Sequence, residues 1–271
     1  MDHRYAQLVD QYVSEFMEKV AGIHSPQVIP IASTKTFENR LKSASNAFEL
    51  NRAFWSDQLN VMEVWRSTFA WRMRELLDGS VLLRKNSALI ASAPILRSAF
   101  ELAQESLVTS AVLSKAINSI EAGALHKKVC IFEEVITYLE IALYGTTIKE
   151  RTKNAGAPRP PRLAKARSVL QSQKLGGEIS KFYERLSDLS HPYWLGNRPF
   201  YRVSKDGTVE TTSSQYDPDW QTEVALDIDS VLAWTAKAGS NVLDQTFVGI
   251  TKMRTALSTQ EFVKANLDSQ T

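Results

Sequence analysis

An arginine, an aspartate and a histidine lie at helical spacing within the segment Phe182–Gly196. Arg185, Asp188 and His191 follow one another at steps of three residues, so neighbouring side chains can touch if the segment is a helix. A histidine exchanges protons near neutral pH, and an arginine beside it supplies a fixed positive charge. The pattern could therefore support acid–base chemistry, or it could be a solvated ladder of alternating charges.

The residues around these three predict the helix that positions them. At about 100° per residue, the three polar side chains fall on the side away from an apolar stripe. Pro192 disfavours the helical conformation for the residue before it, so His191 should lie on the last turn or just beyond it. The stripe itself consists of Ile179, Phe182, Tyr183, Leu186 and Leu189.

The pattern Arg185-x5-His191 resembles the R-x(4–6)-H signature of the HEPN superfamily, helical-bundle proteins of which many are metal-independent endoribonucleases. The resemblance implies that Arg185 and His191 are catalytic. It gives Asp188 the polar role that a residue next to the arginine has in catalytic members, since Leu186 occupies that position here. It also implies a homodimer in which the arginine and histidine of two protomers meet and cleave RNA. The resemblance also implies a toxin or anti-phage role and a neutralising partner.

A basic segment with three prolines precedes this helix, from Lys149 to Arg167. Proline prevents a helix in its middle, so the segment should be extended. It could be an arm that contacts RNA phosphates, or a solvated connector. No aromatic residue lies within it to stack on bases. The side chains of the predicted RNA-binding arm are Lys149, Arg151, Lys153, Arg159, Arg162, Lys165 and Arg167.

Arg97 and Glu101 lie one helical turn apart, on the flank of another apolar stripe. An arginine and a glutamate at this spacing form an ion pair that stabilises an exposed helix by a few tenths of a kcal/mol, roughly. We therefore predict a structural role for the pair. Pro94, one turn earlier, should either kink this helix or begin a new one.

The apolar periodicity predicts an all-α protein, a helical bundle in one domain over residues 1–271. The Asp206-Gly207 turn, flanked by short alternating runs, predicts a small β-hairpin at about 199–213, inserted before the last long helix. Gly and Pro are few, which argues against an all-β or disordered chain. The expected helices cover about 4–20, 34–77 with a break near Asn51–Asp57, 80–118 after a stop at Gly79, and 125–144. Further helices are expected at about 161–174, from Ile179 to His191 after a break at Gly176-Gly177, and in the region after Asp217-Pro218.

The composition excludes several classes of protein. The net charge of +2 is close to neutral, so any affinity for nucleic acid must come from a local patch. A single cysteine, Cys130, fits a small buried residue in a reducing cytoplasm. No signal peptide or membrane-spanning run is present, so no membrane association is predicted. The four histidines have no metal-ligand spacing and no nucleotide-binding motif occurs, so no cofactor is predicted.

Two functions remain open from the sequence. One is a HEPN-like, metal-independent endoribonuclease acting on RNA. The other is a non-catalytic helical module that binds a protein or a nucleic acid, with Arg185 and His191 serving the structure. The apolar Leu186 and the lack of stacking aromatics favour the module. The position of the motif and the neighbouring basic arm favour the nuclease, which is the function that we expect.

Overall fold

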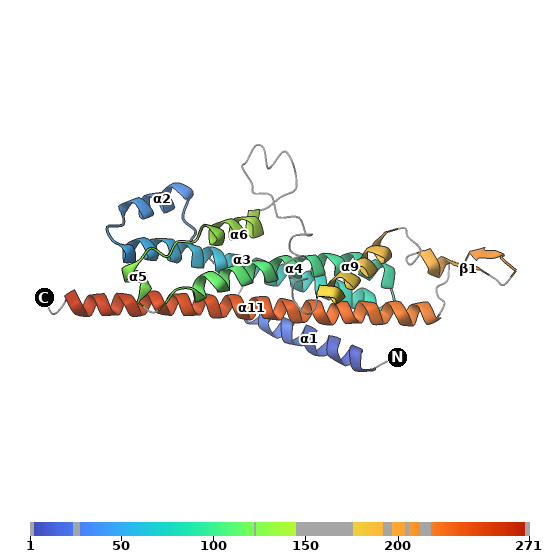
Figure 1. The fold of residues 1–271 in the computed structure, drawn as a ribbon. Coiled ribbons are helices and arrows are strands. Elements are labelled where there is room, and N and C mark those ends of the chain that lie inside the picture. Colours follow the sequence, from blue (N-terminus) through green and yellow to red (C-terminus); the bar gives the residue numbers. More distant parts are fainter. Residues whose placement is uncertain are drawn as a thin grey trace. The chain divides into compact units, whose positions relative to one another are not determined.

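The computed structural model describes residues 3–23, 28–121, 123–144, 176–191, 197–203, 206–211 and 218–268 (Figure 1). These residues are mostly helical, so the predicted all-α class is confirmed. The predicted RNA-binding arm at 149–167 lies outside the described residues. Within the described residues, no helix is long and apolar enough to cross a membrane.

The helices are of very different length, and the longest contains the C-terminal fifth of the chain. The last helix begins at Pro218, as the sequence predicts, because proline suits the first turn of a helix. The helices are α1 (His3–Ala21), α2 (Thr34–Ser43), α3 (Ala47–Lys85), α4 (Leu89–Asn118), α5 (Ala124–Lys127), α6 (Glu133–Tyr144), α9 (Gly176–Ser190), the 3-10 turn η1 (Arg198–Phe200) and α11 (Pro218–Asp268).

Two strands of three residues each, β1 (Tyr201–Val203) and β2 (Val209–Thr211), pair antiparallel between η1 and α11. Tyr201 lies opposite Thr211, and Val203 lies opposite Val209. In the connection, Gly207 has a φ of +86°, a conformation that glycine adopts without strain.

The chain divides into two compact units by its internal contacts. Unit 1 contains Met1–Gly22, Ala70–Glu105 and Pro161–Ser240, and unit 2 contains Ile23–Phe69, Ser106–Pro160 and Asn241–Thr271. Because α3, α4 and α11 each supply residues to both units, the single domain expected over 1–271 stays a prediction.

In unit 1, α11 packs closely on α1 and α3. A Cβ added at Gly239 would lie 3.0 Å from the ring of Phe16, so only glycine fits here without a shift of that ring. Nearby, Arg84 on α3 makes two hydrogen bonds to Asp229 on α11, of 2.9 and 2.8 Å. Asp229 is buried, and this forked pairing compensates its carboxylate for the loss of water.

In unit 2, a buried asparagine on α3 fixes the segment between α5 and α6. The side-chain amide of Asn51 donates to the carbonyls of Leu125 (2.9 Å) and Lys128 (2.8 Å), and its carbonyl accepts the backbone N–H of Cys130 (2.6 Å). These bonds hold residues 128–132 out of helical geometry. The continuous helix predicted over 125–144 is therefore wrong for this segment. Cys130 is buried, and burial raises the pKa of its thiol, so it stays protonated.

Two predicted interruptions of helix α3 are also wrong. The helix runs without a break through Asn51–Asp57, where apolar side chains on its inner face are buried. It also continues past Gly79 to Lys85, and that glycine faces Ile95 of α4, 3.7 Å from the position of an added Cβ. The helix ends where Ser87 takes a φ of +59°. Pro94 lies in the first turns of α4, which is one helix.

Candidate functional site

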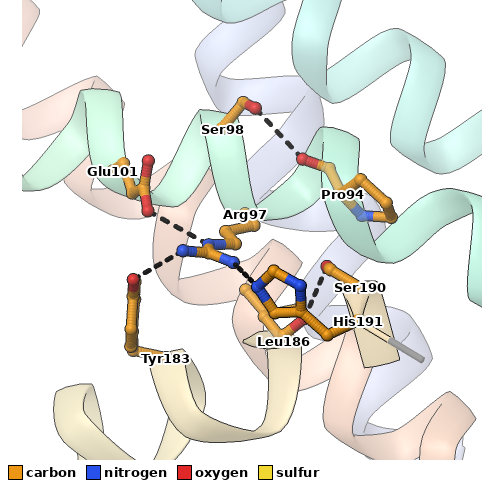
Figure 2. Close-up of polar contacts among 8 residues, drawn as sticks. All are labelled: Pro94, Arg97, Ser98, Glu101, Tyr183, Leu186, Ser190 and His191. Carbon is orange, nitrogen blue, oxygen red and sulfur yellow. Dashed lines mark hydrogen bonds and ion pairs between the residues drawn. The ribbon is translucent and has the colours of Figure 1, made fainter. Parts of the chain in front are cut away.

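Three polar side chains of unit 1 meet around the guanidinium of Arg97 (Figure 2). Arg97 and Glu101 come from α4, Tyr183 comes from α9, and His191 directly follows α9. We call these four residues the Arg97 cluster. Figure 2 shows the guanidinium between the carboxylate, the phenol hydroxyl and the imidazole.

Each nitrogen of the Arg97 guanidinium has a partner in this cluster. Nε donates to Glu101 Oε1 at 3.1 Å, and Nη2 donates to the Tyr183 hydroxyl at 2.6 Å. Nη1 lies 3.3 Å from Nε2 of His191. The Tyr183 ring also lies under the guanidinium, with Cζ 4.8 Å from the ring centroid, in the range of a cation–π contact. The arginine is therefore fixed in direction as well as in position.

Apolar packing of α9 on α4 places the two halves of the cluster next to each other. Ile179, Leu186 and Leu189 of α9 are buried, as the predicted stripe requires. Phe182 meets Phe100 of α4 edge to face, with ring centroids 6.3 Å apart. Because Phe100 lies between Arg97 and Glu101 in sequence, this contact sets the height at which Tyr183 meets the guanidinium.

His191 is positioned by the end of helix α9. Its backbone N–H donates to the carbonyl of Ser187 at 3.0 Å, which is the last helical bond, and the Ser190 hydroxyl donates to the carbonyl of Leu186. The predicted position of His191, on the last turn or just beyond it, is thus confirmed. The imidazole is exposed at this end of the helix and turns toward Arg97 (Figure 2).

The contact with Arg97 indicates which tautomer the neutral imidazole of His191 adopts. A guanidinium can only donate hydrogen bonds, so Nε2 accepts from Arg97 Nη1, and in the neutral imidazole the proton is assigned to Nδ1. Arg97 retains 24% of its side-chain exposure, and Glu101 retains 26%. A small anion can therefore reach the guanidinium from solvent. One turn beyond Glu101, burial and the charge of Glu101 raise the pKa of Glu105, although Arg72 acts in the opposite direction.

The other arginine of this region, Arg185, contacts acidic residues of α11. It donates to Glu223 at 2.8 Å and lies 3.3 Å from the carboxylate of Asp227. Arg198 approaches the same Glu223 at 3.8 Å. Burial raises the pKa of Asp227, and the Arg185 charge lowers it again, while Glu223 adds to the rise.

The structure does not bring the three predicted catalytic residues together within one protomer. Among the described residues, no hydrogen bond or ion pair joins Arg185, Asp188 and His191 to one another. Arg185 binds to α11, His191 contacts α4, and Asp188 is exposed. Leu186 is 1% exposed, so the position after the arginine belongs to the core.

The sequence predicts part of the Arg97 cluster. The predicted ion pair between Arg97 and Glu101 is confirmed at 3.1 Å. The contact between Arg97 and His191 is not predicted, because 94 residues separate the two side chains and no local spacing reports such a contact. The sequence places Tyr183 on the apolar stripe. Its ring does lie at the edge of that stripe, but its hydroxyl turns to the guanidinium.

Comparisons of the chain with protein-family models, with curated proteins and with solved structures gave no match. Within the described ranges, no group of three or more histidine, cysteine, aspartate or glutamate side chains could hold a metal ion. The function must therefore be inferred from the geometry of the Arg97 cluster itself.

Proposed function

We propose that the protein is a metal-independent endoribonuclease in which His191 and Arg97 act on the phosphodiester bond. The observation that supports this proposal is the distance of 3.3 Å between His191 Nε2 and Arg97 Nη1 at an exposed end of α9. It places a proton acceptor beside a fixed positive charge, which is what cleavage through a ribose hydroxyl requires. Arg97 thus takes the part that the HEPN resemblance gives to Arg185.

The imidazole would carry the proton of the reaction. Its Nε2 lone pair accepts from Arg97, and a 2′-hydroxyl that replaces this donor would be in position to lose its proton to the same nitrogen. The 2′-oxygen then forms a bond to phosphorus as the bond from phosphorus to the 5′-oxygen breaks. His191 or water returns the proton to the leaving 5′-oxygen, so the products are a 2′,3′-cyclic phosphate and a 5′-hydroxyl.

Arg97 would bind the scissile phosphate and stabilise the charge that develops on its oxygens. Glu101 and Tyr183 engage Nε and one hydrogen of Nη2, and they keep the fork aimed at the imidazole. Once the 2′-hydroxyl has replaced Nη1 as the donor to His191, both hydrogens of Nη1 are available to phosphate oxygens. Because the site is fixed before substrate arrives, little reorganisation is needed during the reaction.

RNA is the substrate that this chemistry selects, because DNA lacks the attacking 2′-hydroxyl. The basic arm at 149–167 would supply affinity for the phosphate backbone that is independent of sequence. The cytoplasm, self-association into a homodimer, a toxin or anti-phage role and a neutralising partner all remain predictions from the sequence. Since His191 finds an arginine within its own protomer, the proposed reaction does not depend on a second copy.

The test is cleavage of single-stranded RNA by the purified protein in the presence of a chelator. We expect products that end in a 2′,3′-cyclic phosphate, and we expect His191→Ala to lower the rate by roughly 10²–10⁴-fold, as loss of a general acid–base does. His126→Ala is the matched control, because His126 is also exposed but stacks on Phe48 in unit 2. Full activity of His191→Ala, or equal losses in both variants, would rule out this site.

The alternative is a non-catalytic helical module that binds a protein or nucleic-acid partner. One observation favours it: every nitrogen of Arg97 already has a partner on α4, on α9 or directly after α9, as in a purely structural link between helices. In that case the wild type cleaves no RNA, with or without magnesium, and His191→Ala changes only the stability. Measuring both properties on the same variants separates the two functions.

A further inference from the structure

One face of α11 in unit 2 is exposed over four helical turns. Val248 lies at its centre and is 62% exposed, while the opposite face of the helix belongs to the core. At about 100° per residue, each of the other exposed side chains of this face lies within about 60° of Val248. We call this face the Val248 face. Its exposed residues are Asn241, Asp244, Gln245, Val248, Thr251, Lys252 and Thr255.

The Val248 face has opposite charges at equal distances from its centre. Asp244 lies four residues before Val248, and Lys252 lies four residues after it. At about 1.5 Å per residue, each charge is therefore one helical turn from the centre, in opposite directions. If a second copy of the helix packs antiparallel on this face, Asp244 of each copy meets Lys252 of the other. Parallel packing would instead place like charges together.

A small hollow beside Val248 provides room for a side chain of the second copy. It is lined by Ala111, Ser114 and Asn118 of α4 and by Val248, Gly249 and Lys252 of α11. Gly249 lies so close to α4 that an added Cβ would be 3.1 Å from the Ile117 side chain. At this position α11 therefore adds no side chain to the hollow. At the rim, Lys252 Nζ donates to the side-chain Oδ1 of Asn118 at 2.7 Å, which holds the ammonium group on the face.

We propose that the Val248 face is the interface of a homodimer in which two α11 helices pack antiparallel about a two-fold axis at Val248. Burial of the two valine side chains contributes to the association, and the two Asp244–Lys252 pairs select the antiparallel register. This interface differs from the one that the HEPN resemblance implies, because it contains no residue of α9. It also differs from the Arg97 cluster, and RNA cleavage can fail without affecting this proposal.

Charge reversal tests the register in the full-length protein. By sedimentation equilibrium, the wild type should dimerise, and Asp244→Lys or Lys252→Asp alone should raise the dissociation constant roughly tenfold or more, because like charges then meet. The double variant Asp244→Lys/Lys252→Asp should dimerise again, since the pairs are restored with their signs exchanged. Arg254→Asp, exposed but about 120° away from Val248, is the matched control and should leave dimerisation unchanged.

Cysteine cross-linking tests the position of the axis. Val248→Cys should form a disulfide between the two copies under mild oxidation, because residues at the axis of an antiparallel helix pair come within the Cα separation that a disulfide requires. Thr255→Cys should not, because its two copies would lie about 21 Å apart along the helix, but a mixture of Thr255→Cys with Asn241→Cys should cross-link. Circular dichroism checks that each variant is folded, and Cys130 is buried and serves as the background.

The outcomes decide the proposal in either direction. Dimerisation of the wild type, its loss in both single reversals and its recovery in the double variant would establish the interface. A wild type that is monomeric at every accessible concentration would overturn it. So would a dimer that persists in both single reversals, because the contact would then lie on another surface.

Discussion

Two arginines near the same helix illustrate two different uses of a guanidinium. Arg97 on α4 meets one carboxylate, one phenol and one imidazole, whereas Arg185 on α9 meets the carboxylates of Glu223 and Asp227. The single carboxylate of the first set balances the charge of Arg97 and leaves Nη1 directed at an exposed histidine. The second set has two carboxylates, and Arg198 also approaches one of them. An anion such as phosphate therefore meets one carboxylate in contact with Arg97 and two in contact with Arg185.

This difference shows why sequence spacing alone does not identify a catalytic arginine. Arg185 has the spacing to His191 that the HEPN signature describes, and Arg97 is 94 residues away in the chain. The charges of the neighbouring helix decide which of the two can serve an anionic substrate. Asp219, Glu223 and Asp227 occupy the first turns of α11, where acidic residues suit the helix dipole, and the last two of these bind Arg185.

The largest effect that separates the two arginines should be on catalysis. Arg97→Ala should lower the rate of RNA cleavage by roughly 10²–10³-fold, as removal of a fixed electrostatic group from an active site does. Arg97→Lys should recover only part of the rate, because lysine cannot make the three directed contacts of the guanidinium. Arg185→Ala should cleave at close to the wild-type rate. Steady-state kinetics on one RNA oligonucleotide would measure all three variants.

The reverse result would revise the site. If Arg185→Ala loses activity and Arg97→Ala keeps it, the HEPN signature identifies the catalytic arginine correctly. His191 must then meet Arg185 of a second protomer, because the two side chains bind to different helices within one.

The sequence predicted those parts of this site that depend on the geometry of a single helix, and not those that depend on how separate helices pack. Helical periodicity placed His191 at the end of α9 and paired Arg97 with Glu101, because both are consequences of local geometry. The approach of α9 to α4 depends on the packing of Phe182 against Phe100, which no local pattern reports. The partners of Arg185 likewise come from a helix that begins 33 residues later.

A smaller effect should separate the arginines in stability. Arg185 and Glu223 are 41% and 44% exposed, so their ion pair is screened by water and each such contact contributes about 1 kcal/mol or less. Arg185→Ala should therefore lower the free energy of unfolding by roughly 1 kcal/mol in urea at pH 7, and activity should stay the same. Arg84→Ala provides the upper reference, because it leaves the buried Asp229 without its partner, which costs roughly 3–5 kcal/mol.

Two results would contradict this prediction. Loss of several kcal/mol on removing Arg185 would mean that its contacts with α11 are buried in solution. No change for Arg84→Ala would mean that Asp229 reaches water, against its 6% exposure.

The fold could be predicted where the sequence of one helix sets its bounds and its buried face. It could not be predicted where residues far away in the chain set them. The stripes of α1 and α9 and the start of α11 at Pro218 follow from period, proline and capping preferences. The interruption between α5 and α6 depends on Asn51, more than 70 residues earlier, and the sequence around Cys130 reads as helix. Gly79 resembled a helix stop, but α3 continues through it and an added Cβ there would make only an ordinary contact with Ile95 of α4.

The smallest expected effect concerns the pH dependence of stability in the two regions. A carboxyl group near each of the two arginines has a pKa that is raised above its usual value, chiefly by burial. These groups are Asp227, beside Arg185, and Glu105, one turn beyond the Glu101 partner of Arg97. Between the usual pKa, near 4, and the raised one, the folded state holds a proton that the unfolded state has released. The free energy of unfolding therefore falls as the pH rises through this window, and then stays level.

Replacing each carboxyl by its amide should remove this fall in the free energy of unfolding. The two variants together compare the surroundings of Arg185 with those of Arg97. Urea titrations between about pH 4 and pH 7 should show a flatter profile for Asp227→Asn and for Glu105→Gln than for the wild type, with a change of about 1.4 kcal/mol for each unit by which the pKa is raised. In Asp227→Asn, Arg185 also loses one of its two acidic partners, so the gain at neutral pH should be smaller than in Glu105→Gln. A steeper fall in either variant would show that the arginine, not burial, dominates that carboxyl group.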